Sequence, residues 1–416
     1  MYLNNYQHLK NNETFCFIFL FLFSFLIRLP VILLFGDTSL VNEWENLVHN
    51  LITHGKLAYD LDGFLLPNLY MPPLYAYYLY FFSFFNLENK NYIILILSSQ
   101  ILLASISVVV FYKINKLFFS QKISFYSSLM FSLFPLHMYA CSQISSISLQ
   151  MFLAIFYLYF FFQFVIKKNL SSIVIFLFLS GLLILLRGEF RIIFVLSLLY
   201  LFFFFKISIK KILLIFLMTL VTISPYLIRN FIIFEKITIV ETSGYNLWHG
   251  NHPNAMKNSM VEGLDYNPMF DKEIKEQIDV IPKDKFYRIK WDKVFKDQAI
   301  KNIMKEPIGY LIFYAKKVVS FLFITIDPQD SRYWHPLHYL PVLLLGITSL
   351  IGIVLSDKKS YKFNYLIFVF FLNVFIFSAA TILPRYKLAI LPLQIIFTNT
   401  LIVHIKEKFF NQRKNN

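Results

Sequence analysis

The chain has 416 residues, of which 57% are hydrophobic, 19% aromatic and 15% charged, with a mean hydropathy of +0.59. This composition is too apolar for a soluble enzyme, and its regular apolar blocks exclude a disordered chain. The net charge is +15, which in a soluble protein would suggest nucleic-acid binding. Its two cysteines, Cys16 and Cys141, cannot form a disulfide framework or a cysteine-based metal site.

Apolar blocks recur along most of the chain, and a block of about 20 residues crosses a hydrocarbon core of about 30 Å. Two of the blocks are predicted to lie on the outer surface instead. Block 74–85 is too short to cross, and block 310–326 contains Lys316 and Lys317. The ten predicted spans are 15–35, 91–112, 123–140, 145–166, 170–187, 190–206, 211–228, 338–355, 365–383 and 387–405.

The basic residues test this topology, because short loops rich in Lys and Arg stay in the cytoplasm. With both termini inside, the predicted cytoplasmic loops and tails hold 16 basic and 3 acidic residues. Nearly all of the excess charge is therefore an orientation signal, and nucleic acid is excluded as a partner. The clearest basic segments are 113–122, 167–168, 206–211, 358–362 and 406–414.

The predicted fold is an all-α polytopic membrane protein with about ten transmembrane helices. Two juxtamembrane helices are expected in the first outer loop, 36–90, and a small external helical segment in 229–309, with a helix near 286–304 that ends before Pro307. No internal repeat is visible, so an inverted-repeat transporter gains no support. The predicted modules are a seven-span module 1–228, an external loop domain with an interfacial helix 229–337, and a three-span segment with a basic tail 338–416.

The first outer loop contains a predicted surface helix with one apolar face. Asp37 and Glu43 are carboxylates at the mouth of the bilayer, where either could act as a general base on an acceptor hydroxyl or amine. Asp37 could equally cap the helix or be solvated. The apolar face is predicted to comprise Trp44, Leu47, Val48, Leu51 and Ile52, with Glu43, Asn46 and Asn50 facing away.

Several cations are predicted on the outer side, against the positive-inside trend. Arg187 lies two residues before Glu189, which suggests either a salt bridge or a functional pair. Arg385 and Lys387 suit a phosphate diester or a pyrophosphate, although snorkelling of long side chains to the interface also accounts for them.

His249 and His252 have a spacing of three residues, which could suggest metal binding. No carboxylate or third ligand is placed beside them. No metal site and no cofactor are therefore predicted. The sequence does not indicate dependence on a divalent metal, but that alternative stays open.

Taken in order, these segments resemble the GT-C superfamily of integral-membrane glycosyltransferases, which includes protein O-mannosyltransferases, lipid A aminoarabinose transferases and rhizobial lipopolysaccharide transferases. The resemblance extends through most of the chain, and its more specific parts are the Trp-x-Gly-Asn stretch and the Arg-Tyr-Lys stretch. The matching segments are the acid after the first span, Asn50–Gly55, Pro72–Tyr75, Leu186-Arg187, Arg229-Asn230, Asn246–Asn251 and Arg385–Lys387.

The resemblance implies a first module of seven spans, and the charge-based topology also places seven spans before residue 229. It further implies inverting sugar transfer from a polyprenyl-phosphate-linked donor to a lipid, glycan or protein acceptor. The reaction would take place at the outer, periplasmic face of the cytoplasmic membrane. The implied catalytic acids are Asp37 and Glu43, with Asp37 ranked first. The family often has an Asp-Glu pair, whereas this chain has Asn42-Glu43, and it has Met71 where the family often carries a charge.

The remaining implied roles complete the predicted site. The donor phosphate would be bound by Arg385, Lys387, Arg187 and Arg229, and substrates by Tyr70, Trp248, Asn251 and Tyr386.

Two other classes of protein are alternatives to a glycosyltransferase. A lipid-linked-sugar transporter would place ionisable residues in mid-span, whereas here they gather at one face. A polysaccharide polymerase or O-antigen ligase would place its functional arginines and histidine in a large late loop.

Overall fold

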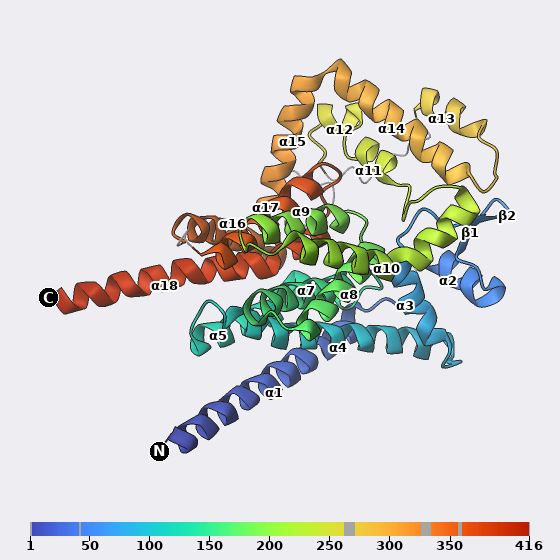
Figure 1. The fold of residues 1–416 in the computed structure, drawn as a ribbon. Helices are drawn as coiled ribbons and strands as arrows, with labels where there is room; N and C mark the ends of the chain where they lie inside the picture. The colour runs from blue at the N-terminus through green and yellow to red at the C-terminus, as the bar shows by residue number, and fades with distance from the viewer. Residues whose placement is uncertain (1, 41–42, 262–270, 326–333, 357–359, 416) are drawn as a thin grey trace.

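The computed structural model describes residues 2–40, 43–261, 271–325, 334–356 and 360–415. Asn42, Lys358 and Lys359, which the sequence analysis invoked, lie outside these residues. Helices form a bundle from which both termini emerge on one side, and the first loop and the segment with α11–α14 lie away from the termini (Figure 1). We call that second side the loop end of the bundle.

The first half of the chain supplies the bundle's early helices and the first loop, which contains a small hairpin. The elements are α1 (Tyr2–Phe35), α2 (Glu43–His54), β1 (Ala58–Leu61), β2 (Phe64–Pro67), α3 (Pro73–Ser83), α4 (Asn89–Asn115), α5 (Gln121–Leu133), α6 (Pro135–Ala140), α7 (Ile147–Lys167), α8 (Leu170–Leu186) and α9 (Phe190–Phe203).

The second half adds the outer segment and the last helices of the bundle. The elements are α10 (Ile209–Phe234), α11 (Ser243–His249), α12 (Pro253–Lys257), α13 (Lys272–Asp279), α14 (Tyr287–Lys305), α15 (Pro307–Leu322), α16 (Pro336–Val354), α17 (Tyr361–Ser378), η3 (Pro384–Ala389) and α18 (Leu391–Asn415).

Within the described residues, six helices are long and apolar enough to cross a membrane: α1 from Glu13 onward, α4, α7, α10, α16 and α17. The apolar helices α8 and α9 are shorter, at 17 and 14 residues. The predicted span 123–140 is broken into α5 and α6 at Pro135, whose ring has no N–H to continue the helix. The chain is a multi-pass membrane protein, and the count of ten crossings stays a prediction.

Aromatic side chains fill the centre of the bundle between α7, α9 and α17. The rings of Phe161 and Tyr365 stack with centroids 3.7 Å apart, and both residues are fully buried. The Tyr365 hydroxyl donates to Ser197 Oγ at 2.9 Å and lies 3.2 Å from the Tyr157 hydroxyl. These hydrogen bonds satisfy polar groups where no water is present to do so.

The packing of α16 on α18 depends on Gly352, where a Cβ would collide with the Phe397 carbonyl oxygen. We expect Gly352→Ala to lower the stability of the detergent-solubilised protein by about 1–3 kcal/mol, because the backbone oxygen cannot move aside. Thermal unfolding monitored by circular dichroism measures this. The control is Gly309→Ala, where the nearest atom is the flexible Glu306 carboxylate at 3.0 Å, so stability should hold or rise. An equal effect of the two substitutions would contradict the packing argument.

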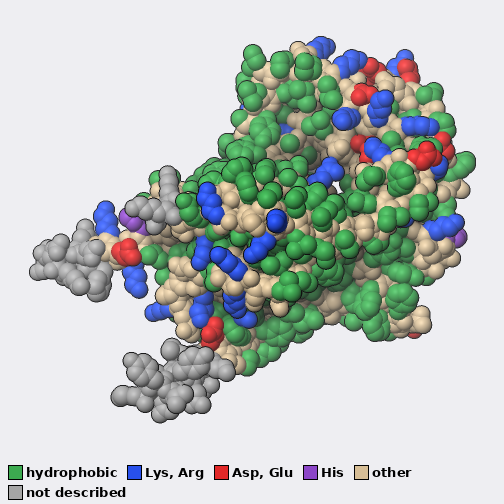
Figure 2. Space-filling model, viewed as in Figure 1, with side chains coloured by type: hydrophobic (Ala, Val, Ile, Leu, Met, Phe, Trp, Pro, Cys, Tyr) green, Lys and Arg blue, Asp and Glu red, His purple; other side chains and the backbone are tan. Residues whose placement is uncertain are grey.

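Charged side chains are unevenly distributed over the surface. Figure 2 shows Lys and Arg side chains gathered over the part of the bundle nearer the termini, with few acidic ones among them. Basic and acidic side chains are mixed over the region of α13 and α14. This matches the charge asymmetry from which the sequence topology was derived.

The first loop differs in two ways from its predicted form. The apolar face of α2 includes Trp44 and Leu47 as predicted, but Ile52 is 54% exposed and Asn50 is buried. Asn50 turns inward because its Nδ2 donates to the Ala58 carbonyl oxygen at 3.0 Å, which joins α2 to an unpredicted β-hairpin.

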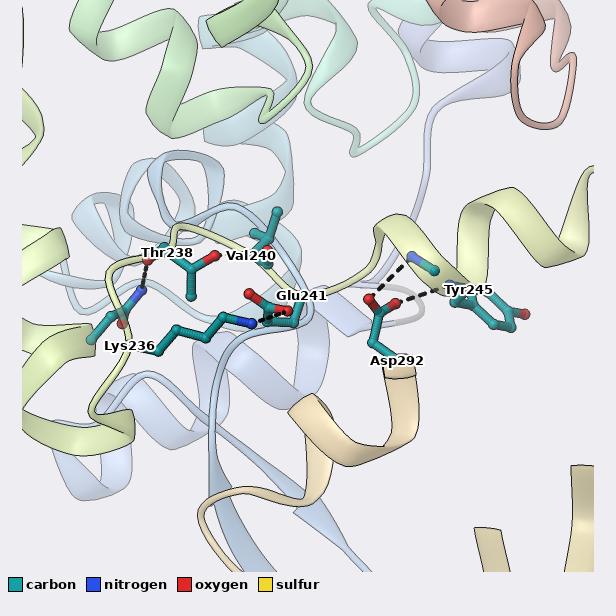
Figure 3. Close-up of polar contacts among 8 residues, drawn as sticks. Lys236, Thr238, Val240, Glu241, Tyr245 and Asp292 are labelled. Atoms are coloured by element: carbon teal, nitrogen blue, oxygen red, sulfur yellow. Dashed lines mark hydrogen bonds and ion pairs between the residues drawn. The ribbon is translucent and has the colours of Figure 1, made fainter. Parts of the chain in front are cut away.

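The outer segment has its own small core around the fully buried Trp248, with Ile274, Phe295 and Ala299. The helix predicted near 286–304 is α14. Asp292 on α14 accepts hydrogen bonds from the backbone N–H groups of Gly244 and Tyr245 at 3.1 and 2.9 Å, which fixes the start of α11 on α14 (Figure 3). Lys236 and Glu241 form an ion pair at 2.9 Å in the chain that leads from α10 to α11 (Figure 3).

Lys317 on α15 is fully buried and joins the outer segment to the loop after α17. Its Nζ donates to Asn251 Oδ1 at 2.6 Å and to the carbonyl oxygens of Gly250 and Ala380 at 3.1 and 3.2 Å. The backbone approach is close here, because a Cβ on Gly250 would collide with the backbone of Ala380.

Candidate active site

Asp37 is held at the connection between α6 and α7. Its Oδ2 accepts a hydrogen bond from the N–H of Ile144 at 2.6 Å, and its own N–H donates to the Ser142 carbonyl oxygen at 3.0 Å. Burial raises the pKa of the half-buried Asp37 carboxyl, while the Ile144 N–H lowers it. Its Oδ1 accepts no hydrogen bond from the residues described, so the carboxylate is positioned through one oxygen and the other can receive a proton.

Glu43 begins α2 and is also half-buried. With the described part of the chain it forms no hydrogen bond or ion pair. Burial raises the pKa of Tyr70, Arg288 lowers it, and Glu43 raises it further. Glu43 acts on Tyr59 in the same sense. Glu43 therefore acts electrostatically on these two tyrosines, whereas Asp37 is held by the connection between α6 and α7.

Arg187 and Arg385 come from distant parts of the sequence and lie against one ring. Their guanidinium carbons are 5.5 and 5.7 Å from the centroid of the Tyr386 ring. Arg187 also donates from Nε to Gln150 Oε1 at 2.8 Å, and its Nη1 lies 3.8 Å from Glu189 Oε1. The salt bridge considered from the sequence is thus present, and its length leaves Arg187 with donor capacity to spare.

A cavity extends from Arg187 into the bundle between α7, α8, α9 and α17. Its empty volume is about 590 Å³. The cavity has a polar rim at the loop end of the bundle, where α7 and α9 begin and α8 ends. The rim consists of Gln150, Arg187 and Glu189. The walls of the cavity are mostly apolar and include Met151, Leu158, Leu183, Ile193, Val369, Phe377 and Leu393. A mostly apolar cavity with one arginine at its rim has a lining suited to an apolar ligand that carries an anionic group.

The other two predicted phosphate ligands bind backbone carbonyls. Arg229 donates to the carbonyl oxygens of Leu57 and Asn68 at 3.0 and 3.1 Å, which joins α10 to the first loop. Lys387 is buried, and its Nζ donates to the Phe323 carbonyl oxygen at 2.9 Å. These contacts give both residues a role in folding, and their binding of a phosphate stays a prediction.

Two of the predicted substrate contacts are also built into the core. Trp248 is fully buried. Asn251 donates from Nδ2 to the carbonyl oxygens of Leu247 and Ala379 at 2.7 and 2.9 Å, in addition to accepting from Lys317. Tyr386 differs from both, since its ring lies against Arg385 and against the rim residue Arg187. Burial raises the pKa of Tyr70, and Tyr386 adds to this rise.

The sequence analysis missed Arg288, at the second position of α14. Its guanidinium carbon lies 4.0 Å from the centroid of the Tyr70 ring and 3.6 Å from that of Trp291. Arg288 thus stacks on Tyr70, whose pKa is raised chiefly by burial and further by Glu43 and Tyr386. Only the three-dimensional contact reveals this, because a single arginine on a charged helix carries no sequence signal.

The two histidines weighed as metal ligands make other contacts. His249 Nδ1 lies 3.3 Å from Thr381 Oγ1, and His252 Nδ1 accepts from the N–H of Ala255 at 3.1 Å, which caps α12. Burial lowers the pKa of both histidines, that of His252 to about 4. Among the residues described, no group of three or more His, Cys, Asp or Glu side chains is placed to hold a metal ion.

The fold is similar to that of a solved archaeal oligosaccharyltransferase, in agreement with the fold that the resemblance of the sequence motifs implied. Neither a protein-family profile nor a curated protein matches the chain by sequence. Comparison of structures supplies the match, at identities that show a shared fold and no more.

Two solved structures of one archaeal enzyme illustrate it. The oligosaccharyltransferase AglB from Archaeoglobus fulgidus, in complex with an inhibitory peptide and a dolichol-phosphate, gives a TM-score of 0.55 at 12% identity over 97% of this chain and 52% of AglB. The same enzyme tethered to an acceptor peptide containing the NVT sequon gives 0.57 at 12% identity, over 96% of this chain and 51% of that one. This chain thus spans about half the length of AglB. ArnT from Cupriavidus metallidurans, bound to undecaprenyl phosphate, gives 0.39 at 13% identity over 90% of this chain and 77% of ArnT.

Proposed function

We propose that this protein is a membrane glycosyltransferase that moves a sugar from a polyprenyl-phosphate-linked donor to a lipid, glycan or protein acceptor. The observation that carries the proposal is the apolar cavity whose rim holds Arg187, beside Arg385 and Tyr386. In this proposal the cavity receives the prenyl chain and the arginines receive the phosphate. Asp37 and Glu43 lie at the same end of the bundle, where the sugar would emerge.

The chemistry follows from the leaving group. A departing polyprenyl phosphate gains negative charge, and Arg187 and Arg385 stabilise it through fixed positive charges in a site of low polarity. Asp37, or Glu43, takes the proton from the attacking hydroxyl or amine of the acceptor. A single displacement of this kind inverts the anomeric carbon. The arginines supply the positive charge, so the proposal requires no metal ion and no cofactor.

The proposal also assigns the parts of the molecule to compartments. We place the loop end at the outer face of the cytoplasmic membrane, because the basic loops lie at the other side. Residues 1–228 form the catalytic module, residues 229–337 the external domain with α15 as its interfacial helix, and residues 338–416 the final three spans and the basic tail.

The direct test is incubation of the purified protein in liposomes with radiolabelled polyprenyl-phosphate sugars and with lipid extract as the acceptor. We expect labelled sugar on a new lipid or glycan, identified by its mass, together with release of polyprenyl phosphate. A lipid-linked sugar that crosses the bilayer with its mass unchanged would identify a transporter instead. Growth of the glycan on its own lipid carrier would identify a polymerase.

A further inference from the structure

Arg288 joins the outer segment to the first loop by stacking rather than by hydrogen bonding. Its guanidinium lies between the rings of Tyr70 and Trp291, at 4.0 and 3.6 Å from their centroids. Two aromatic rings fix the plane of the guanidinium and leave its edge, where the N–H groups lie, for other partners.

That edge carries a positive charge for which the described residues provide no counter-ion. Nε and Nη2 of Arg288 are buried and have no hydrogen-bond partner among those residues. Burial lowers the pKa of Arg288 to about 10, so the side chain is still a cation at neutral pH. Two buried donor nitrogens without a hydrogen-bond partner are costly, and a half-buried guanidinium retained in this state calls for an anion.

Among the described residues, the carboxylate that acts electrostatically on Arg288 is already engaged. Asp292 lies one helical turn after Arg288 on α14, but both of its carboxylate oxygens accept hydrogen bonds from the backbone of α11 (Figure 3). Burial lowers the pKa of Arg288, and the negative charge of Asp292 acts in the opposite direction. The two side chains do not form an ion pair. The hydroxyl of Tyr59 is a second buried polar group without a hydrogen-bond partner in the described residues, and Arg288 acts on it electrostatically.

We propose that Arg288, with the hydroxyl of Tyr59, binds a negatively charged group of the acceptor, a phosphate or a carboxylate. A planar guanidinium binds either group through two parallel N–H···O hydrogen bonds, and the tyrosine hydroxyl adds a third donor. The acceptor of this enzyme is accordingly an anionic molecule. This inference rests on the proposed glycosyltransferase function and narrows its substrate.

The position of Arg288 favours the acceptor over the donor. The apolar cavity for the prenyl chain is lined by α7, α8, α9, α17, η3 and α18, and no residue of α14 lines it. Arg288 instead belongs to the outer segment and lies on Tyr70, the residue near which Glu43 is also placed. An anionic group held there would bring an attached hydroxyl or amine towards the candidate bases from the aqueous side.

The test is a titration of the purified full-length protein in detergent, followed by the fluorescence of its tryptophans, because Trp291 lies on the Arg288 guanidinium. Inorganic phosphate and acetate are added separately at constant ionic strength maintained with sodium chloride. We expect a saturable change with at least one of these anions. Arg288→Gln should weaken its binding at least tenfold, and Tyr59→Phe should weaken it several-fold. Saturation by phosphate alone assigns a phosphorylated acceptor, and saturation by acetate alone assigns a carboxylate.

Controls separate this site from the arginines at the cavity rim. Lys285→Gln removes an exposed cation from the same part of the chain, and Arg385→Gln removes a rim cation, so both variants should retain the tryptophan response. If Arg288→Gln does not elute as a folded protein, Arg288→Lys, which keeps the charge but loses the planar fork, replaces it with the same direction of effect. The proposal is overturned if the Arg288 variants keep the saturable fluorescence change, or if the unaltered protein shows no saturable change with either anion.

The titration measures no sugar transfer, so its outcome is separable from that of the proposed function. Anion binding at Arg288 without any sugar transfer would support the anion site and contradict the proposed glycosyltransferase function. Conversely, if Arg288→Gln transfers sugar with an unchanged KM for the acceptor, the glycosyltransferase function is supported and the anion site is contradicted.

Discussion

Asp37→Asn is expected to abolish sugar transfer, with a fall in kcat of about 10²–10⁴-fold, the usual contribution of a general base. The amide keeps the size of the side chain and can still accept the hydrogen bond from the N–H of Ile144, but it cannot take a proton. Transfer is measured with a labelled polyprenyl-phosphate sugar in proteoliposomes, after matching protein amounts by gel. The matched control is Glu45→Gln on the exposed face of α2, which should keep full activity.

The competing base gives the informative alternative. If Glu43→Gln abolishes transfer and Asp37→Asn does not, the base is Glu43, and the ranking of the two carboxylates is reversed. The pH profile adds a second readout. Burial raises the pKa of Asp37. On acidification, kcat should therefore begin to fall at a higher pH than it would for an aspartate of ordinary pKa. The carboxylate is the active form, so the rate rises with pH through this limb.

Arg385→Ala is expected to weaken the binding of undecaprenyl phosphate by about 10- to 100-fold, since a hydrogen bond to a charged group contributes about 1.5–3 kcal/mol. Arg187→Ala should have an effect of the same order, because both guanidinium groups lie over Tyr386 at the cavity rim. Binding is measured by isothermal titration calorimetry in detergent.

The control for these variants is Arg191→Ala, an exposed arginine in the first turn of α9. Its loss should change donor affinity little, because exposed charges are well screened. If both Arg385→Ala and Arg187→Ala bind undecaprenyl phosphate with unchanged affinity, these two arginines do not bind the donor phosphate. An equal loss in all three variants would show a nonspecific effect of net charge.

The sequence was sufficient for the course of the helices. Every predicted span contains helix, the two blocks predicted to lie on the surface are α3 and α15, and the predicted outer helix is α14. The helices could be predicted because the hydropathy of about 20 consecutive residues is a local property of the sequence. Their placement across or on the membrane stays a prediction.

One local signal was overlooked. Asp62 and Gly63 have φ values of 51° and 81°, which the two-residue turn between β1 and β2 requires. An Asp-Gly pair between two short apolar runs is a hairpin signal. The burial of Asn50 was missed for the same reason, since the carbonyl oxygen of Ala58, to which its amide donates in addition to Asn46 Oδ1, belongs to the hairpin.

The candidate site was only partly predictable. Arg187, Arg385 and Tyr386 were each singled out by charge and motif, and the structure brings them together. Arg229, Lys387, Asn251 and Trp248 were equally plausible from sequence, yet their side chains contact backbone or core. Whether a polar residue faces a cavity or a carbonyl group depends on contacts between distant segments, which residue spacing does not encode. Arg288 was missed for the same reason.

The junction around Lys317 has an evolutionary consequence. One ammonium group serves the carbonyl oxygens of Gly250 and Ala380 and the amide of Asn251, and the absence of a side chain at Gly250 allows the two backbones to meet. A change at any one of Gly250, Asn251 and Lys317 leaves a buried polar group without its partner or forces the backbones apart. Divergent descendants of this gene should therefore keep these three positions together or exchange them together.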